Sequence, residues 1–274
     1  MFRVSNNLIG ILNILSLILS IPILGGSWWL REHASSDCQK FIETPLLVVG
    51  GFLFLVSLIG LIGSCCRVSL LLWIYLFVTF VLILGLFVFT IFAIAVTNKG
   101  VGKVISGRGY KDYRLGDYSN WLQRHVVDGS NWVKTKSCLI ETHVCSSLGN
   151  DFYDLQASQF YQKKFSPIQS GCCKPPTDCG FIYKNATFWV APKLGPAVPD
   201  SDCTTWSNNQ ETLCYDCKSC KAGVLANLKK DWRKLAILNV SVIIILLIVY
   251  SVGCCALRNN REDNGYKRYR PYQP

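Results

Sequence analysis

Four long apolar blocks limit what this 274-residue chain can fold into more than any other feature of its sequence. They cover residues 8–25, 45–65, 70–96 and 235–257, and none of them contains Asp, Glu, Lys or Arg. A helix needs about 20 apolar residues to cross a bilayer, and each block is near or above that length. The first block is too long for the apolar core of a signal peptide, and no small-residue cleavage site follows it before Trp28. The sequence therefore predicts four retained transmembrane helices.

The charges of the short flanking segments predict the orientation. Arg3, Arg67 and five basic residues after position 257 lie on one side, whereas the short loop on the other side has two basic residues against three acidic ones. Short cytoplasmic segments carry the excess of Lys and Arg, so we expect both termini in the cytoplasm. The predicted parts are a cytoplasmic N-terminus (residues 1–7), four spans (8–26, 45–65, 70–96 and 235–257), a small outer loop (27–44), a cytoplasmic turn (66–69), a large outer loop (97–234) and a cytoplasmic tail (258–274).

The fourteen cysteines fall into two groups on this topology. Ten lie in the outer loops, where an oxidising environment favours disulfides. The large loop alone holds nine, an odd number, so we predict one bridge from Cys38 to the large loop. The expected fold is an all-α membrane protein with a small and a large disulfide-stapled extracellular loop, the large loop being helical plus irregular. The ten expected disulfide cysteines are Cys38, Cys138, Cys145, Cys172, Cys173, Cys179, Cys203, Cys214, Cys217 and Cys220.

The other four cysteines lie at the cytoplasmic edge of the predicted spans. They form two adjacent pairs, Cys65 with Cys66 and Cys254 with Cys255. Juxtamembrane cysteines are typical S-palmitoylation sites. Cysteine is also among the residues most often buried, so plain buried thiols are the alternative. We favour acylation because both pairs lie at the same predicted depth.

Residues 171–179, which read GCCKPPTDC, form the double-cysteine segment in the middle of the large loop. Disulfide geometry requires Cα atoms roughly 4.4–6.8 Å apart at a set torsion, so the adjacent Cys172 and Cys173 can hardly pair with each other. They should point in different directions and tie two other parts of the loop to one point. Pro175 and Pro176 prevent a helix from continuing and stiffen the exit.

A zinc site is an alternative use of the cysteines near the end of the large loop. Cys214, Cys217 and Cys220 are closely spaced, and His125 and His143 could supply further ligands. The oxidising compartment favours disulfides instead, and no second cysteine pair stands at zinc-ribbon spacing. We expect no metal and no cofactor.

The apolar pattern of the large loop predicts several helices. Amphipathic stretches cover residues 118–131 and 132–145, and a short helix is expected over residues 151–164. A further helix over residues 217–232 should run directly into the fourth span. Between residues 171 and 209, frequent Pro, Gly, Asn and Asp predict loops held by disulfides.

Three asparagines have distinct interpretations. Asn185 begins an Asn-Ala-Thr glycosylation acceptor in the large loop, in agreement with the outward orientation. Asn239 begins the same pattern inside the fourth predicted span, where it cannot be used. Asn13 and Asn239 could form hydrogen bonds between helices, each contributing about 0.6 kcal/mol. We interpret both as packing residues.

Composition and motifs argue against an enzyme, a nucleic-acid binder and a transporter. The net charge is +11, but 19 of the 28 basic residues lie in the large loop among acidic ones, and no nucleic-acid motif accompanies them. The three histidines are scattered, and the sequence lacks Gly-x-Ser-x-Gly, His-Glu-x-x-His and a phosphate-binding glycine loop. No ionisable residue lies at membrane depth, where a transporter or channel normally keeps one.

The order of these features resembles the tetraspanin family. Four spans, a small and then a large outer loop, and a cysteine pair followed by Pro176-Thr-Asp-Cys179 carry the resemblance. The run Gly171, Cys172, Cys173, Lys174, Pro175 and Pro176 is similar to the land-plant branch, as is Cys214-Tyr-Asp-Cys217-Lys-Ser-Cys220. The resemblance covers essentially the whole chain, and Asn13 fits the family's polar position in the first span.

The chain departs from the animal members at two places. Lys174 follows the cysteine pair where the animal pattern has glycine, and the third and fourth spans contain neither Glu nor Gln. The disulfide pairing of animal members therefore cannot be transferred. The resemblance implies only that Cys172 and Cys173 each bridge to cysteines further along the chain.

The resemblance implies a non-catalytic organiser of the plasma membrane, with secretory or endosomal vesicles as a further location. Members of the family assemble lateral microdomains and act in cell differentiation, development, cell communication and vesicle secretion. The implied partners are membrane lipids, with sterol among the candidates, other tetraspanins as homo- and hetero-oligomers, and other membrane proteins bound through residues 145–165 or 180–209 of the large loop. The alternative is a lipid or sterol carrier, or a small transporter, with a cavity between the four helices.

Overall fold

The computed structural model describes residues 4–33, 37–66, 68–98, 102–105, 108–146, 148 and 155–269. The chain divides into two compact units. The membrane unit comprises Met1–Ile91 and Ile237–Pro274, and the loop unit comprises Phe92–Ala236.

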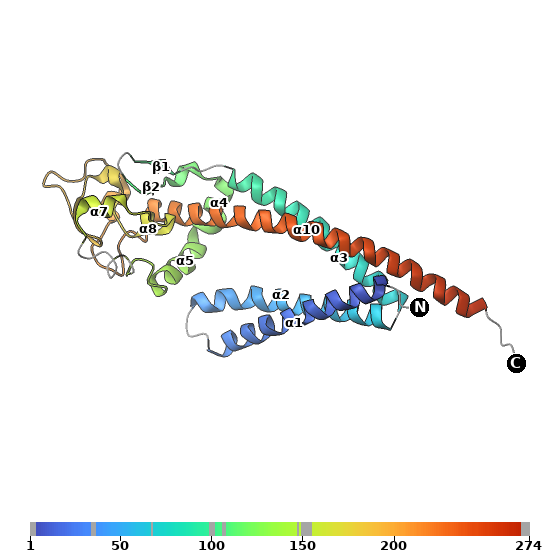
Figure 1. The fold of residues 1–274 in the computed structure, drawn as a ribbon. Helices are drawn as coiled ribbons and strands as arrows, with labels where there is room; N and C mark the ends of the chain where they lie inside the picture. Colours follow the sequence, from blue (N-terminus) through green and yellow to red (C-terminus); the bar gives the residue numbers. More distant parts are fainter. Residues whose placement is uncertain are drawn as a thin grey trace. The chain divides into compact units, whose positions relative to one another are not determined.

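Four long helices are apolar and long enough to cross a membrane. They are α1 (Val4–His33), α2 (Asp37–Cys65), α3 (Ser69–Thr97) and α10 (Lys218–Tyr269). The prediction of a helical protein with four transmembrane helices and a disulfide-bonded large loop is confirmed. In Figure 1, α1 and α2 run side by side in opposite directions. α3 lies beside α10, to which it is joined at Asn239.

The long helices extend beyond the apolar blocks from which they were predicted. α10 continues without interruption from residue 218 to residue 269, because no proline falls within this stretch. The expected helix over residues 217–232 and the fourth span therefore form a single 52-residue helix. Pro22 and Pro45 lie inside α1 and α2, as neighbouring helices and local adjustments allow in membrane segments.

Polar side chains join the helices of the membrane unit. The Asn239 amide of α10 donates to the Leu86 carbonyl oxygen at 3.1 Å and to Thr90 Oγ1 at 2.7 Å, both on α3. Asn6 of α1 donates to Asn260 Oδ1 of α10 at 3.0 Å. Asn13 donates to the Ile9 carbonyl oxygen of its own helix at 2.8 Å. Asn239 therefore forms hydrogen bonds between two helices, whereas the hydrogen bond that Asn13 donates stays within its own helix.

Eleven shorter elements build the loop unit in the part of the chain that the structure describes. The helices are α4 (Asn120–Val126), α5 (Gly129–Glu141), α7 (Ala157–Gln162), α8 (Pro167–Cys172) and α9 (Ser201–Thr205), with single turns η1 (Leu115–Asp117) and η2 (Thr177–Cys179). Two antiparallel hairpins pair β1 (Lys103–Val104) with β2 (Lys111–Asp112) and β3 (Ile182–Asn185) with β4 (Phe188–Val190).

Local capping explains where the helices differ from the predicted ranges. Asp128 accepts a hydrogen bond from the backbone N–H of Gly129, which has a φ of +52°, so one helix ends and α5 begins three residues before the predicted start. Ser166 and Gln169 form a capping box that starts α8 at Pro167, a helix absent from the prediction. Of the expected 151–164 helix only α7 is observed, and residues 151–154 lie outside the described residues.

The core of the loop unit consists of cysteines and aromatic residues. Phe160 is fully buried and contacts the rings of Tyr183 and Trp189 from the β3–β4 hairpin. The same cluster includes the disulfide cysteines Cys172, Cys173 and Cys220, among others. The segment from 171 to 209 is therefore not only loop, because its hairpin packs an aromatic face into this core.

Candidate functional site

The double-cysteine segment begins with a glycine because α8 packs directly on α10. A Cβ on Gly171 would collide with the Ser219 carbonyl oxygen, and a Cβ on Gly223 would collide with the Pro167 carbonyl oxygen. Both helices therefore need a residue without a side chain where they meet. This close approach brings Cys172 next to α10.

Four disulfides can be followed among the described residues of the loop unit. Cys172 bonds to Cys220, Cys173 to Cys145, Cys179 to Cys203, and Cys214 to Cys217. The adjacent cysteines thus point to two different parts of the loop. The implication that both bridge to later cysteines is wrong for Cys173, because α8 ends at Cys172 and turns the next side chain toward the segment after α5.

The remaining two outer cysteines, Cys38 and Cys138, are also disulfide-bonded. The bridge from Cys38 to the large loop stays a prediction. The paired Cys214 and Cys217 are not metal ligands, and no group of His, Cys, Asp or Glu among the described residues could hold a metal ion.

Lys174, the residue that distinguishes this motif from the animal pattern, is buried in an ion pair. Its ammonium lies 2.7 Å from Asp112 Oδ1 and 4.6 Å from the centre of the Tyr110 ring. The other carboxylate oxygen of Asp112 accepts the backbone N–H of Thr177 at 3.1 Å. The double-cysteine segment is therefore attached to β2 through a charge-assisted pair as well as through disulfides.

Burial and the partner charge act in opposite directions on this pair. Burial alone would raise the pKa of Asp112, but the Lys174 ammonium and the Thr177 backbone N–H outweigh it and hold that pKa below its ordinary value. Burial lowers the pKa of Lys174, and the Asp112 carboxylate opposes that shift. Burial also raises the pKa of the adjacent Tyr110 to about 12, although its hydroxyl is bonded to Arg108.

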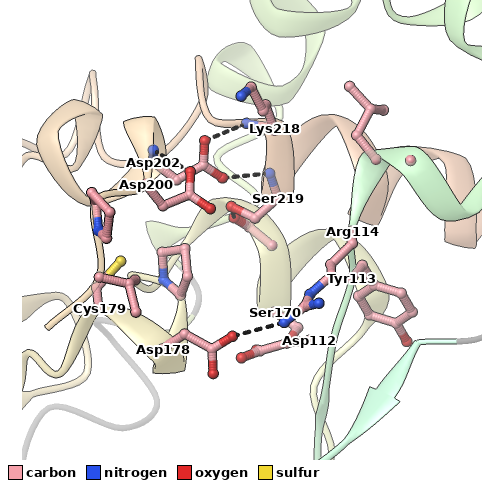
Figure 2. A pocket seen from close by; sticks show the side chains of 16 residues that line it. Asp112, Tyr113, Arg114, Ser170, Asp178, Cys179, Asp200, Asp202, Lys218 and Ser219 are labelled. Atoms are coloured by element: carbon pink, nitrogen blue, oxygen red, sulfur yellow. Dashed lines mark hydrogen bonds and ion pairs between the residues drawn. The ribbon is translucent and has the colours of Figure 1, made fainter.

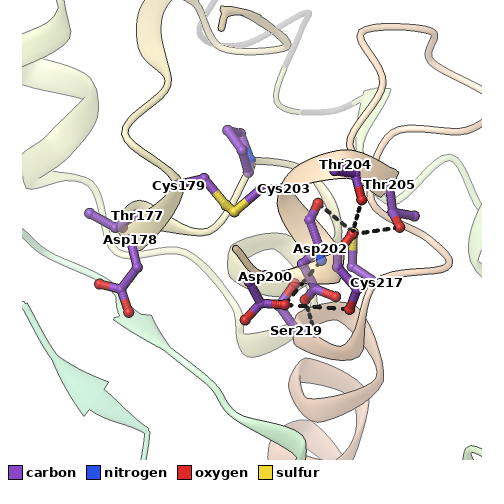
Figure 3. The surroundings of a disulfide bond; sticks show 12 residues. Thr177, Asp178, Cys179, Asp200, Asp202, Cys203, Thr204, Thr205, Cys217 and Ser219 are labelled. Atoms are coloured by element: carbon purple, nitrogen blue, oxygen red, sulfur yellow. Dashed lines mark hydrogen bonds between the residues drawn. A yellow bond between two sulfur atoms is a disulfide. The ribbon is translucent and has the colours of Figure 1, made fainter. Parts of the chain in front are cut away.

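A buried aspartate fixes the start of α10. Asp202 of α9 is only 4 % exposed, and its two carboxylate oxygens accept the backbone N–H groups of Lys218 at 2.8 Å and Ser219 at 2.7 Å. Asp200 in turn caps α9 by accepting the N–H of Asp202 at 3.1 Å. Figure 3 shows both aspartates beside the Cys179–Cys203 disulfide, which connects this corner to the double-cysteine segment.

A pocket of about 490 Å³ lies between the double-cysteine segment, β2, and the corner formed by α9 and the start of α10. Figure 2 shows Asp178 and Asp200 on one side and Arg114 on the other. Asp178 is paired with Arg114 at 3.1 Å and with Lys103 at 3.7 Å. The lining residues are Asp112, Tyr113, Arg114, Leu115, Gly116, Ser170, Gly171, Pro176, Asp178, Cys179, Val198, Pro199, Asp200, Asp202, Lys218 and Ser219.

The β3–β4 hairpin has an apolar surface on the side away from the core. Ile182 pairs with Val190 across the strands, and Phe188 lies two residues before Val190, so all three share one side of the hairpin. They are 61 %, 38 % and 46 % exposed, respectively. We call these three residues the hairpin face.

The outer edge of β4 is closed by a side chain. The Asn208 amide donates to the Trp189 carbonyl oxygen and accepts the Trp189 N–H, both at 2.9 Å. This pairing imitates a neighbouring strand and satisfies an edge that could otherwise recruit another chain.

The other predicted site residues lie as follows. Asn185 ends β3, and its side-chain oxygen accepts the N–H groups of Thr187 at 3.1 Å and Phe188 at 2.7 Å. Asn239 lies in a helix of membrane-spanning length, and its side-chain amide is bonded to α3. The glycosylation pattern that begins at Asn239 therefore belongs to a residue that packs between helices. The four remaining cysteines, Cys65, Cys66, Cys254 and Cys255, are free and exposed at the ends of α2 and near the C-terminal part of α10.

Several residues of the site were not found from the sequence. Three of them are aspartates that the sequence does not distinguish from ordinary surface acids: Asp112, Asp200 and Asp202. Their spacing carries no sign that a carboxylate bonds to a residue far away in the chain. The capping box at Ser166 was detectable, because Ser-Pro-x-Gln is a start signal for a helix. That signal would have placed Cys172 at a helix end.

The fold and this disulfide-bonded corner define a multi-pass membrane protein with four spans and one large, cross-linked loop. The model of the Tetraspanin family matches residues 5–256. The chain is 53 % identical to Tetraspanin-8 of Arabidopsis thaliana over the full length of both chains. It is 52 % identical to Tetraspanin-7 of the same plant, over 96 % of this chain and 99 % of the relative.

The chain belongs to the tetraspanin family, and the similarity to the land-plant branch is confirmed by these relatives. A third Arabidopsis thaliana relative, Tetraspanin-11, is 50 % identical over 95 % of this chain and 97 % of its own length. No solved structure matches the chain. Membership of this family, whose members are generally non-enzymatic, supports a role as a membrane scaffold.

Proposed function

We propose that the protein organises lateral assemblies in the plasma membrane by binding other membrane proteins through the hairpin face of its large loop. The large loop faces the cell exterior and both termini are cytoplasmic. Self-association, contact with membrane lipids including sterol, and roles in differentiation, development, cell communication and vesicle secretion belong to the same proposal. No catalytic step is required.

The exposed hairpin face is the observation that carries this proposal. A two-stranded antiparallel hairpin normally directs apolar residues to the core and polar residues to water. Here the core side holds Tyr183 and Trp189, and the water side still presents Ile182, Phe188 and Val190. Apolar residues gathered on one solvent-facing surface are typical of a protein-binding site.

The charges beside the hairpin face define the partner it suits. Lys184 follows Ile182 by two residues on the same side of β3 and is exposed. Lys193 is exposed a few residues after β4. A partner with an apolar patch bordered by carboxylates would match this arrangement, with the apolar contact supplying affinity and the charges supplying orientation.

Two modifications fit the same proposal. A glycan on Asn185 would extend from the hairpin turn beside Phe188, its partner across the strands. Acyl chains on Cys65, Cys66, Cys254 and Cys255 would favour lateral clustering, since these free thiols are exposed and adjacent in pairs.

A substitution experiment tests the role of the hairpin face. Ile182, Phe188 and Val190 are changed together to Thr, which keeps the strand preference but removes the large apolar surface. The full-length variant is expressed in plant cells, with a photoreactive residue at Lys184 to capture neighbours. We expect the specific crosslinked membrane proteins of the unmodified chain to be lost.

A matched control keeps this result interpretable. Val133 of α5 is 64 % exposed but lies outside the hairpin, so Val133→Thr should leave the crosslinked set unchanged. A triple variant that retains its disulfides and its partners would show that the hairpin face is not the binding surface. If the triple variant loses its disulfides, the single Phe188→Thr variant is tested in its place. That variant must show the same loss of partners.

A further inference from the structure

Asp200 is the carboxylate of the pocket that remains open to a ligand. Asp112 is paired with Lys174, Asp178 with Arg114 and Lys103, and both oxygens of Asp202 are taken by the start of α10. Asp200 uses Oδ1 for the cap of α9, and its Oδ2 has no bonding partner among the residues that the structure describes.

The lining of the pocket also includes apolar groups. They are Pro176, Val198, Pro199, Leu115 and the ring of Tyr113. The lining contains four carboxylates against the two cations Arg114 and Lys218, in a chain whose net charge is +11. The pocket therefore suits a short apolar group that carries one positive charge beside it.

Phosphate and metal ligands do not fit this pocket. The backbone N–H groups at the start of α10, which would attract an anion, are already bonded to Asp202. No metal-binding group of side chains is present among the described residues. With anions and metal ions excluded, the lining favours an occupant that has an apolar group and a positive charge.

The chain itself presents such a group on a fastened turn. Leu194 is the most exposed large apolar side chain of the described residues, with a relative exposure of 103 %, and Lys193 beside it is also exposed. The Gly195 N–H donates to the Pro192 carbonyl oxygen at 3.0 Å, which closes the turn. We call Lys193 and Leu194 the tip.

The tip is held by its surroundings. After the turn, the Ala197 N–H donates to the Cys179 carbonyl oxygen at 3.1 Å, and the Cys179–Cys203 disulfide closes the whole segment. Gly195 has a φ of +89°, a left-handed conformation that glycine adopts without strain. Leu194 is therefore presented to water by a closed turn, at little further cost in conformational entropy on binding.

We propose that the tip of one copy of this chain inserts into the pocket of a second copy. Leu194 then contacts Val198, Pro176 and Pro199 of the neighbour, and the Lys193 ammonium pairs with the open Oδ2 of Asp200. This contact rests on the lateral-assembly function proposed above and specifies one self-association surface within it.

A molecule cannot fill its own pocket with its own tip. Leu194 is fully exposed, so it contacts no part of its own pocket, and only three residues separate it from Val198 in the pocket wall. The tip and the pocket are different surfaces, so the contact is heterologous, and each copy offers a tip to one neighbour and a pocket to another. Repetition of this contact produces a ring or a row of copies in the membrane.

A site-specific crosslink tests the proposal on the full-length chain in membranes. A photoreactive leucine analogue replaces Leu194 in one copy, and a second copy is isotopically labelled. We expect crosslinks to the labelled copy that map to the pocket residues Pro176, Val198 and Pro199. Asp200→Asn keeps the cap of α9, since Asn caps as well as Asp, but removes the charge and should lower the yield about tenfold.

Asp128→Asn is the matched control. Asp128 also caps a helix, α5, but it lies outside the pocket lining, so the crosslink yield should stay unchanged. An equal yield in the Asp200→Asn protein, or crosslinks that map away from the pocket, would overturn the proposal.

A complementation experiment separates a lost contact from a damaged fold. The tip variant, Lys193→Ser with Leu194→Ser, retains the pocket, whereas the Asp200→Asn protein retains the tip. Neither should crosslink to copies of itself, but a mixture should restore crosslinks from the tip of the Asp200→Asn protein into the pocket of the tip variant. Failure of the mixture, with both proteins retaining their disulfides, would contradict a heterologous contact.

Failure of the contact between tip and pocket can be distinguished from failure of the proposed function. Crosslinks from Lys184 to other membrane proteins are measured in the same membranes. If these persist while the tip gives no crosslink between copies, only the self-association surface is wrong. If the Lys184 crosslinks are absent as well, the proposed lateral function fails with it.

Discussion

The ammonium of Lys174 lies 2.7 Å from the carboxylate of Asp112, 62 positions earlier in the chain, and is almost completely buried. This pair connects the double-cysteine segment to β2 at a place where no disulfide does so. It gives a physical reason for lysine after the cysteine pair in this chain, because a glycine there could not reach Asp112. Asp112 of this pair also lines the pocket.

Removing one partner of this pair should destabilise the loop unit strongly. Asp112→Asn leaves the Lys174 charge buried without a counter-charge, and breaking a buried pair in this way costs about 3–5 kcal/mol. The free energy of unfolding is measured by hydrogen exchange of the full-length chain in detergent. Lys136 and Asp216, also 2.7 Å apart but much more exposed, provide the control, and Asp216→Asn should cost less than about 1 kcal/mol.

The contribution of this pair should depend on pH. The folded pKa of Asp112 lies below the ordinary value of 3.8, so the stabilisation is fully present above that value and is lost as the pH falls through the folded pKa. The difference in unfolding free energy between the unmodified chain and Asp112→Asn should therefore be constant near neutral pH and shrink below about pH 4. A difference that stays the same down to pH 2 would show that the charge of Asp112 is not involved.

The disulfides of the loop unit should contribute unequally to its stability. Cys172 and Cys220 are 48 residues apart, whereas Cys214 and Cys217 are 3 apart. Loop-closure entropy then predicts a loss of about 4 kcal/mol for the first pair and about 2 kcal/mol for the second when both cysteines of a pair become Ser. Limited proteolysis should show an unfolded loop unit in the first variant, with all four spans still inserted. A protease-resistant loop unit in that variant would contradict the central role of the double-cysteine segment.

Asn13 and Gly60 should be coupled in the membrane unit. A Cβ on Gly60 would lie 2.5 Å from Asn13 Oδ1, so Gly60→Ala should cost about 1–3 kcal/mol through overpacking. Adding Asn13→Ala removes the obstructing amide and should recover part of that cost, as measured by unfolding in mixed detergent and dodecyl sulfate. Gly51→Ala on the same helix is the control, because no atom lies within 4 Å of its Cβ position. Strict additivity of the Asn13 and Gly60 changes would refute the contact.

The fold could be predicted from the sequence because its strongest signals are local. Uncharged blocks of bilayer length determine the four helices, and the adjacency of Cys172 and Cys173 requires two separate bridges. Both conclusions need only chain length and bond geometry. The family could be recognised for the same reason, from residues contiguous in the sequence.

The site itself could not be predicted, because it depends on contacts between distant residues. Whether Asp112 meets Lys174, or Asp202 meets the start of α10, depends on how the disulfides fold the chain back on itself. The partner of Cys173 was wrongly placed for the same reason. The hairpin was missed because turn residues surround it, although Tyr183 and Trp189 alternate with exposed residues as strands do.

Crosslinking in native membranes tests whether this protein is a lateral scaffold whose large loop selects its partners. Residues 97–234 are exchanged for the corresponding segment of a relative, and the crosslinked membrane proteins are identified with and without sterol depletion. We expect the set of partners to change with the loop and to persist in part without sterol. An unchanged set, or a sterol or solute dependence with no specific partners, would contradict this expectation and favour a carrier with a cavity between its helices.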